Sequence, residues 1–290
     1  MRGEFVDLDG VRLYCYAFGQ RGAGHPIVLV HGSFTSSHLW QDVLPRLPKG
    51  HRVLVLDLLG HGRSDPPGSH AMTVAAHATR LEQLLDVMGV REAVLVGHGM
   101  GAAIAARVAH EWPEHIAQLM LVNPTLLAAN AGEAPLNRRV RRVASLVWLW
   151  KRLSPAWLAS ALHSVLLPGF AHRGVGAHAL DVYLKPFRMR DGRDAACAQL
   201  AALQRSRGDT VQTLAPGAIR CPTALVLGND DPFLDETRRG RVVGWVKAAT
   251  NGTATVHTLS GVAHVAPEEA PDRLGTLVSE LITRRPFRYP

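Results

Sequence analysis

Five short apolar runs recur along this chain of 290 residues, and each ends just before a glycine, histidine, asparagine or aspartate. Continuous runs of four or five such residues are typical of strands that are buried on both faces. They therefore predict a parallel sheet with both sides covered. The five runs are Ile27–Val30, Val53–Leu56, Ala93–Val96, Leu119–Val122 and Thr223–Leu227.

Helical patterns lie between the apolar runs, over Val74–Met88 and Ala102–Trp112. Alternation of strands and helices indicates an α/β fold with a mostly parallel sheet and helices on both faces. Near the N-terminus, Asp9-Gly10 separates two alternating segments, which is a strong signal for a β-hairpin. We expect this antiparallel hairpin to lie at the edge of the sheet.

The alternation stops between residues 126 and 210, and strand patterns resume at Thr223. Within this stretch, Arg138–Leu167 has a helical pattern that Pro155 interrupts, and Ala195–Gln204 has another. The simplest interpretation is a helical insertion in one α/β domain. The predicted division is a core made of residues 1–125 and 211–290, with residues 126–210 inserted between its two parts.

The positive charge of the chain lies in this insertion. The whole chain has 32 basic and 24 acidic residues, which gives a net charge of +8 and raises the question of nucleic acid or acidic membranes. Residues 126–210 carry thirteen basic and five acidic residues, whereas the rest carries nineteen of each. The core therefore has no basic stripe for nucleic acid, and we expect no nucleic-acid partner. The insertion either attracts anionic compounds or makes a weak contact with an acidic membrane surface.

Cysteine usage and hydropathy favour a cytoplasmic protein. The three cysteines, at positions 15, 197 and 221, are odd in number and far apart, so no disulfide framework is expected. The first ten residues lack the apolar centre of a signal peptide. The longest apolar stretch, Val143–Leu167, contains two basic residues and a proline, and is too interrupted to span a bilayer.

Five polar motifs accompany the predicted strands and helices in a fixed order. The motifs are His31-Gly32-Ser33-Phe34, the segment Asp57–Asp65, Gly97-His98-Gly99-Met100-Gly101, Gly228-Asn229-Asp230-Asp231-Pro232 and Gly261-Val262-Ala263-His264. Together they resemble the α/β-hydrolase superfamily, in its branch with a helical cap. The resemblance extends from Phe5 to about Thr283.

The resemblance implies a role for particular positions. In the superfamily's nucleophile elbow, G-x-S-x-G, the nucleophile falls on Gly99 in this chain. The resemblance implies that Asp231 is the acid and His264 the general base of a catalytic triad. It also implies an oxyanion hole made by backbone N–H groups, and a cap formed by the insertion. The N–H groups would come from Ser33, Phe34 and Met100.

Glycine at position 99 is a departure from the family pattern, because it has no side chain with which to form a covalent intermediate. Three explanations are open. The chain is a serine esterase-like hydrolase whose nucleophile was changed to glycine, or an enzyme in which Asp231 and His264 act on water or on a substrate proton. The third explanation is a non-catalytic, ligand-binding relative. Glycine also relieves the backbone strain that an elbow imposes.

The apolar insertion favours a small apolar or anionic-apolar substrate, because a cap contacts whatever enters the site. A rival motif, Gly97-x-Gly99-x-x-Ala102, matches the dinucleotide-binding fingerprint. That fingerprint requires an acid at the end of the next strand, where Asn123-Pro124 stands instead. The chain also lacks H-E-x-x-H and similar metal-ligand spacings. We therefore expect neither a cofactor nor a metal.

Overall fold

The computed structural model describes residues 3–19, 24–125, 139, 142–205 and 215–283. Its centre is one eight-stranded sheet in the order β1-β2-β4-β3-β5-β6-β7-β8. The pairs β1–β2 and β2–β4 are antiparallel, and all the others are parallel. The strands are β1 Gly3–Leu8, β2 Val11–Phe18, β3 Ile27–Val30, β4 Val53–Leu56, β5 Ala93–His98, β6 Ile116–Val122, β7 Thr223–Gly228 and β8 Thr255–Leu259.

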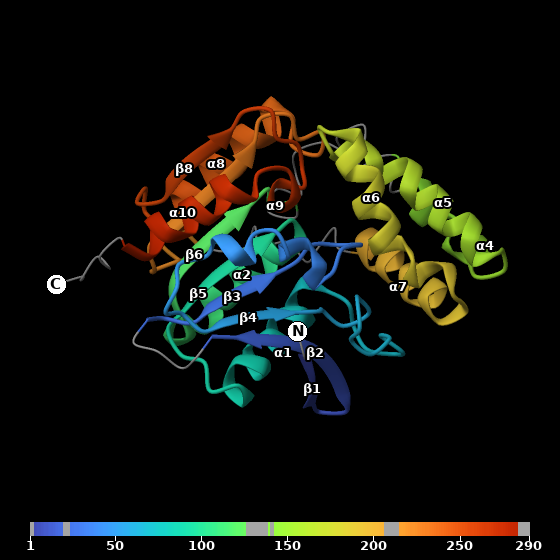
Figure 1. Cartoon of the computed structure of the whole chain (residues 1–290), viewed down its shortest axis with the longest axis horizontal. Coiled ribbons are helices and arrows are strands. Elements are labelled where there is room, and N and C mark those ends of the chain that lie inside the picture. Colours follow the sequence, from blue (N-terminus) through green and yellow to red (C-terminus); the bar gives the residue numbers. More distant parts are fainter. Residues whose placement is uncertain (1–2, 20–23, 126–138, 140–141, 206–214, 284–290) are drawn as a thin grey trace.

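Helices cover both faces of the sheet, which confirms the predicted fold class (Figure 1). Successive residues of a strand point to opposite faces, and the two cores divide accordingly. Val28 and Val30 of β3 belong to the core that includes α1, α2 and α8, whereas Ile27 and Leu29 belong to the core that includes α10. These helices are α1 Val74–Val87, α2 Met100–Glu111, α8 Glu236–Ala249, α9 Ala266–Glu269 and α10 Pro271–Thr283.

A group of helices lies between β6 and β7 in the chain, at one side of the sheet, with α4 and α5 at its outer end (Figure 1). Their buried side chains join the core on the α10 face. We call residues 142–205 the helical insertion. The structure does not settle its predicted limits, since residues 126–138 and 206–214 lie outside the described part of the chain. Its helices are α4 Val147–Trp150, α5 Pro155–Leu166, α6 Arg173–Leu184 and α7 Arg190–Arg205.

Some elements differ from the sequence prediction. Helix α2 starts at Met100, two residues before the predicted start, because the turn at Gly99 leads directly into it. Helix α7 begins at Arg190 rather than Ala195, since its first turn is polar. Strand β8 was not predicted, because it alternates between exposed and buried residues rather than forming an apolar run. Short 3₁₀ helices were also not predicted; they are η1 Ser37–Trp40, η2 Leu44–Arg46, η3 Pro113–His115, η4 Leu167–Gly169 and η5 Pro186–Arg188.

The predicted interruption at Pro155 is confirmed. Helix α4 ends at Trp150, and Pro155 is the first residue of α5, where its missing N–H costs nothing. Across the described residues, no helix combines the length and apolar character needed to cross a bilayer.

Candidate active site

A tight turn joins β5 to α2 at the carboxyl edge of the sheet. Gly99 forms it with φ 57° and ψ −116°, a backbone conformation that strains any residue with a Cβ. The neighbouring glycines are required by space, since a Cβ at Gly97 would overlap the carbonyl of Gly101, and one at Gly101 would overlap the carbonyl of Val30. The N–H of Gly99 donates to the Val122 carbonyl of β6 at 3.0 Å, which fixes the turn against the sheet.

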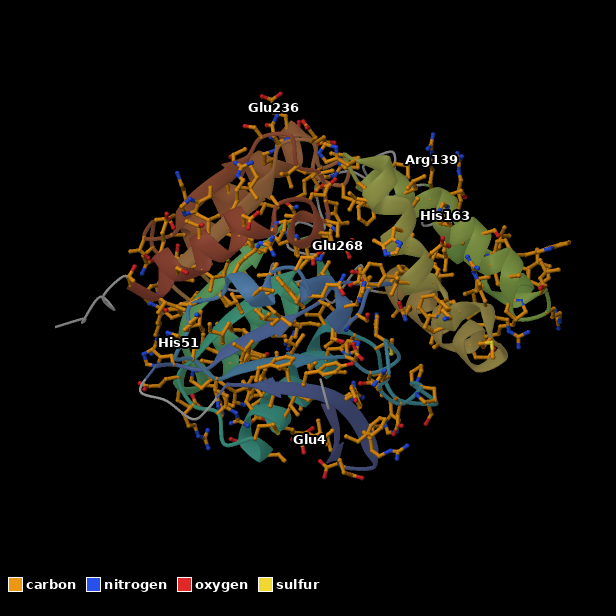
Figure 2. All side chains as sticks on the ribbon, in the orientation of Figure 1. Glu4, His51, Arg139, His163, Glu236 and Glu268 are labelled. Carbon is orange, nitrogen blue, oxygen red and sulfur yellow. The ribbon has the colours of Figure 1, made fainter. Side chains whose placement is uncertain are left out.

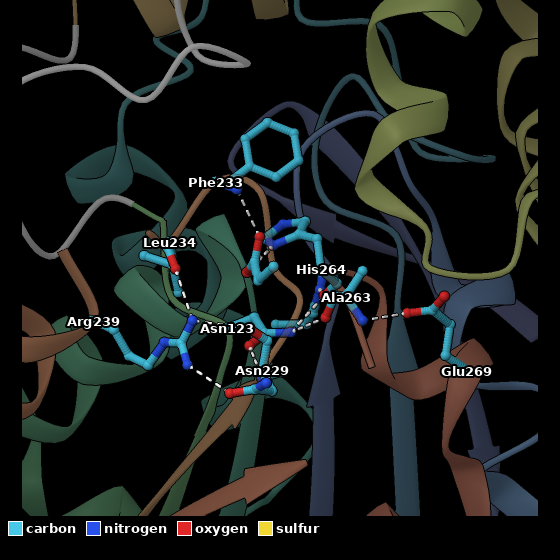
Figure 3. Close-up of polar contacts among 11 residues, drawn as sticks. Asn123, Asn229, Phe233, Leu234, Arg239, Ala263, His264 and Glu269 are labelled. Carbon is cyan, nitrogen blue, oxygen red and sulfur yellow. Dashed lines mark hydrogen bonds and ion pairs between the residues drawn. The ribbon is translucent and has the colours of Figure 1, made fainter. Parts of the chain in front are cut away.

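A histidine–aspartate pair lies beside this turn, and Figure 3 shows its histidine, His264, next to Phe233. The Nδ1 of His264 is 2.8 Å from Oδ2 of Asp231, whose carboxylate is buried and also accepts the Phe233 N–H at 2.8 Å. Because an ionised carboxylate only accepts, Nδ1 carries the proton and Nε2 of the neutral ring keeps a lone pair. The pair is therefore arranged as an oriented general base.

The lone pair of His264 faces the position where a side chain at residue 99 would be. A Cβ built on Gly99 would lie 3.5 Å from Nε2 of His264 and 3.7 Å from Cα of Gly32, both ordinary contact distances. The Phe233 ring lies against the imidazole, with centroids 4.6 Å apart. The backbone N–H of His264 donates to the Gly169 carbonyl in the helical insertion at 2.9 Å. The insertion thus contacts the catalytic candidate directly.

The three predicted oxyanion-hole residues differ in what their backbone groups do. Met100 is the first residue of α2, so its N–H has no acceptor one turn earlier in the helix. The Ser33 hydroxyl donates to the Met100 sulfur at 3.4 Å, which brings these two residues together. By contrast, the Phe34 N–H donates to Oε1 of Gln199 at 3.2 Å, and the Gln199 amide donates to the Gly60 carbonyl at 2.8 Å. One predicted donor is therefore already engaged by the insertion.

Asn123 was missed as a supporting residue by the sequence reasoning. It follows β6, is fully buried, and has φ 42°. Its side-chain amide donates to the carbonyls of Ala263 and His264 at 2.9 and 2.7 Å, and its oxygen accepts the Gly228 N–H at 2.7 Å (Figure 3). The available signal was an asparagine directly after a buried strand. The sequence reasoning considered this position only because a dinucleotide-binding site would need an acidic residue there.

Glu269 and Gln199 were also missed, and both join the insertion to the core. The Glu269 carboxylate accepts the N–H groups of His172 at 3.1 Å and Ala263 at 2.8 Å, so it connects the insertion to the residue before His264. Gln199 of α7 is buried between two loops of the core, as described above. Neither residue belongs to a motif, so only the folded structure reveals its contacts.

Other histidines near the site are not suited to act as bases. His98 is buried and its Nε2 donates to the His264 carbonyl at 2.9 Å, and burial lowers the pKa of its ring to about 3. Burial likewise lowers the pKa of His31 to about 4, and its Nε2 accepts the Leu58 N–H at 2.9 Å. These rings hold the loops around the site as neutral hydrogen-bonding groups.

Within the described residues, one group has the side chains and spacing of a metal site: Glu82, Asp86 and His115. His115 precedes β6, so this group lies at the amino end of the parallel strands, opposite the edge that carries His264. The Arg91 guanidinium already bonds Asp86 at 2.9 Å and His115 at 2.8 Å. Because the positively charged guanidinium already bonds to these side chains, the group does not fit a metal ion.

A mostly parallel sheet with a strained turn and a histidine–aspartate pair at its carboxyl edge is an arrangement typical of the α/β-hydrolase fold. The chain belongs to the alpha/beta hydrolase fold family, whose model matches residues 25–271.

Curated relatives point to several activities within this family. Haloalkane dehalogenase 1 of Mycobacterium tuberculosis is 30% identical over 215 residues, which cover 73% of this chain and 61% of that protein. The cis-3-alkyl-4-alkyloxetan-2-one decarboxylase of Shewanella oneidensis is 24% identical over 97% of this chain and 88% of its own length. An uncharacterised protein of M. tuberculosis is 36% identical over 110 residues, so this chain matches about a third (32%) of its length.

Solved structures support the fold. An α/β hydrolase fold protein from Burkholderia ambifaria has a TM-score of 0.80 at 24% identity, and covers 96% of this chain and 97% of its own. At this level of identity, the similarity concerns the arrangement of helices and strands alone. The comparison with solved structures therefore shows that the chain shares this fold.

Proposed function

We propose that the protein is an α/β-hydrolase-fold enzyme in which His264 and Asp231 act without a covalent nucleophile. The observation that carries this proposal is the 2.8 Å hydrogen bond between these side chains, retained beside a glycine turn. Gly99 stands where a nucleophile is expected and has no side chain, so an ester intermediate cannot form on it. The base is therefore available to water or to an acidic proton of the substrate.

In the hydrolytic form of the mechanism, a water molecule takes the place of the missing side chain next to Nε2 of His264. Nε2 removes one proton from this water while its oxygen attacks the electrophilic carbon of the substrate. Asp231 stabilises the imidazolium that forms, and the imidazolium then gives the same proton to the leaving group. In the non-hydrolytic form, Nε2 takes a proton from the substrate itself and returns it to the product, as in lyase or cyclase chemistry.

Charge that develops on a substrate oxygen would be stabilised by the N–H groups of Ser33 and Met100, in the role of an oxyanion hole. Phe34 would join them only if the side chain of Gln199 moved away from its N–H, to which it is now bonded. The Phe233 ring beside His264, together with Val165 of the insertion in one apolar cluster, favours a small apolar or anionic-apolar substrate. We propose the insertion as the cap of this site.

Substitution of His264 by alanine is expected to lower turnover by at least about 100-fold, because it removes the general base. The measurement is turnover of a panel containing short p-nitrophenyl esters, haloalkanes and oxetan-2-ones, the last two taken from the names of the relatives. Asp231→Asn should also lose most of the activity, since it no longer orients the ring for proton transfer. His70→Ala, at an exposed position, is the control. Turnover that persists in His264→Ala rules out the mechanism.

The alternative is a non-catalytic protein that binds a small ligand in the same site. One observation favours it, because an internal glutamine already occupies the Phe34 N–H. This alternative predicts that the unmodified protein turns over no member of the panel. It also predicts that a bound member of the panel keeps its calorimetric affinity in His264→Ala, whereas an enzyme would lose turnover in the same variant.

A further inference from the structure

Exposed large apolar side chains are concentrated on the helical insertion. Of the nine such residues in the described chain, six lie there, including two tryptophans. Trp148 of α4 is 59% exposed and Trp157 of α5 is 64% exposed. Helices α4 and α5 lie at the outer end of the insertion (Figure 1). The six are Leu146, Trp148, Trp157, Val175, Val182 and Met189. A concentration of exposed apolar side chains on one segment of a chain is typical of a contact site.

The outward face of α5 also lacks charge. Its inner face is formed by buried leucine, alanine and valine, whereas Ala156, Trp157, Ser160 and Ser164 are exposed. No residue of α5 is a lysine, arginine, aspartate or glutamate. A helix that faces only water usually carries charged residues on its outer side. The outer side of α5 is thus suited to a less polar surrounding.

Basic residues flank α4 and α5 along the chain, and Arg139 is one of them (Figure 2). Arg139, Arg142, Lys151 and Arg152 are exposed, and no carboxylate in the described part of the chain forms an ion pair with them. The sequence from residue 134 to residue 180 contains seven lysines and arginines and no aspartate or glutamate. The positive charge of the basic residues around α4 and α5 is therefore not neutralised locally.

We infer that the outer side of α4 and α5 docks on an anionic lipid bilayer. Tryptophan prefers the boundary between lipid headgroups and hydrocarbon, where Trp148 and Trp157 would insert. The four basic side chains would then contact lipid phosphates, whose attraction for lysine and arginine falls as salt is added. The docking does not depend on the chemistry at Gly99.

A second copy of the chain fits this surface less well. A two-fold contact brings the same patch of both copies together, and here it would place two sets of unpaired basic residues opposite each other. Like charges in such a position oppose association. An anionic bilayer supplies the complementary charge and an apolar layer at the same time.

The test is co-sedimentation of the full-length protein with vesicles of phosphatidylcholine, with or without phosphatidylglycerol. We expect binding to the anionic vesicles that weakens as salt is raised, together with a blue shift of tryptophan emission. The double variant Trp148→Ser/Trp157→Ser should reduce the partition coefficient by about tenfold or more. Arg142→Ala/Lys151→Ala should reduce binding and its salt dependence.

The matched control is Val87→Ser, which removes an apolar side chain with 63% exposure from α1, outside the helical insertion. It should bind vesicles as the unmodified protein does, and circular dichroism should show that all variants are folded. The inference is overturned if the unmodified protein does not bind anionic vesicles, or if the double tryptophan variant binds them equally well. It is also overturned if sedimentation equilibrium shows a dimer that the double variant dissociates, because the surface would then belong to a second copy.

Discussion

Replacing Gly99 by serine is expected to give the protein ester hydrolysis at least about 1,000-fold faster than the unmodified chain. The Cβ of the new residue would lie 3.5 Å from Nε2 of His264, so its hydroxyl can reach hydrogen-bonding distance of the ring. His264 would then activate the hydroxyl, and Asp231 already holds the ring in the required tautomer. The measurement is the burst and steady-state hydrolysis of p-nitrophenyl acetate.

The matched control for this substitution is Gly99→Ala, which adds the same Cβ without a hydroxyl. In both variants a residue with a Cβ adopts a strained backbone conformation with positive φ, so both should lose about 1–3 kcal/mol of stability in urea unfolding. Gly99→Ser combined with His264→Ala should abolish the gain. If Gly99→Ser is no faster than Gly99→Ala, the chain is not a serine hydrolase that lacks only its nucleophile.

Four fully buried histidines are expected to contribute a loss of about 5 kcal/mol of folding free energy when the pH is lowered from 7.5 to 5.5. They are His31, His61, His77 and His98. Burial lowers the pKa of His31 to about 4 and of His61 and His98 to about 3, and it holds the pKa of His77 well below its usual value.

The sign follows from the neutral state of these rings in the folded protein. Above pH 6.5 the unfolded chain is also neutral at these positions, so the full stability is present. As the pH falls below 6.5 the unfolded chain takes up protons that the folded chain does not, and stability is lost down to about pH 3–4. One pH unit below 6.5, this amounts to about 1.4 kcal/mol for each histidine.

Glu268 acts in the opposite direction. Burial raises the pKa of its carboxyl to about 7, although the Tyr183 hydroxyl donates to it. This carboxyl therefore contributes stability at low pH that is lost as the pH rises from about 4.5 to about 7. It offsets part of the histidine effect, so the difference between a variant and the unmodified protein is more informative than the total.

His77 provides the variant that isolates the histidine effect, because neither of its ring nitrogens has a hydrogen-bond partner among the described residues. His77→Leu should keep or raise stability at pH 7.5 and reduce the loss between pH 7.5 and pH 5.5 by about 1.4 kcal/mol. Urea unfolding at the two pH values measures both quantities. His70→Leu, at an exposed position, should change neither. The prediction is contradicted if His77→Leu loses as much stability between pH 7.5 and pH 5.5 as the unmodified protein does.

The sheet could be predicted from the sequence because strands buried on both faces need continuous apolar runs. All five runs became strands β3 to β7, and the Asp9-Gly10 hairpin became β1 and β2 at one edge. Strand β8 lies at the other edge and is half exposed, so its alternating pattern did not stand out. Helix α6 contains two glycines, which weaken any helical pattern.

The candidate site could be predicted only in part. The resemblance to the α/β-hydrolase superfamily implied that Asp231 and His264 share one site, and the structure brings them within hydrogen-bonding distance. Asn123, Gln199 and Glu269 stand outside the motifs and meet their partners only through the folding of distant segments. For the same reason, the engagement of the Phe34 N–H by Gln199 could not be foreseen.

Gln199 has a consequence for the way such proteins can be recombined. Its one amide group satisfies a donor in the loop after β3 and an acceptor in the loop after β4, while its backbone belongs to α7. A chimera that takes its helical insertion from a relative would leave both loop groups without a hydrogen-bond partner, unless the relative's helix has a side-chain amide at the position equivalent to Gln199. Exchange of whole insertions between proteins of this fold should therefore succeed most often when the two loops are transferred along with them.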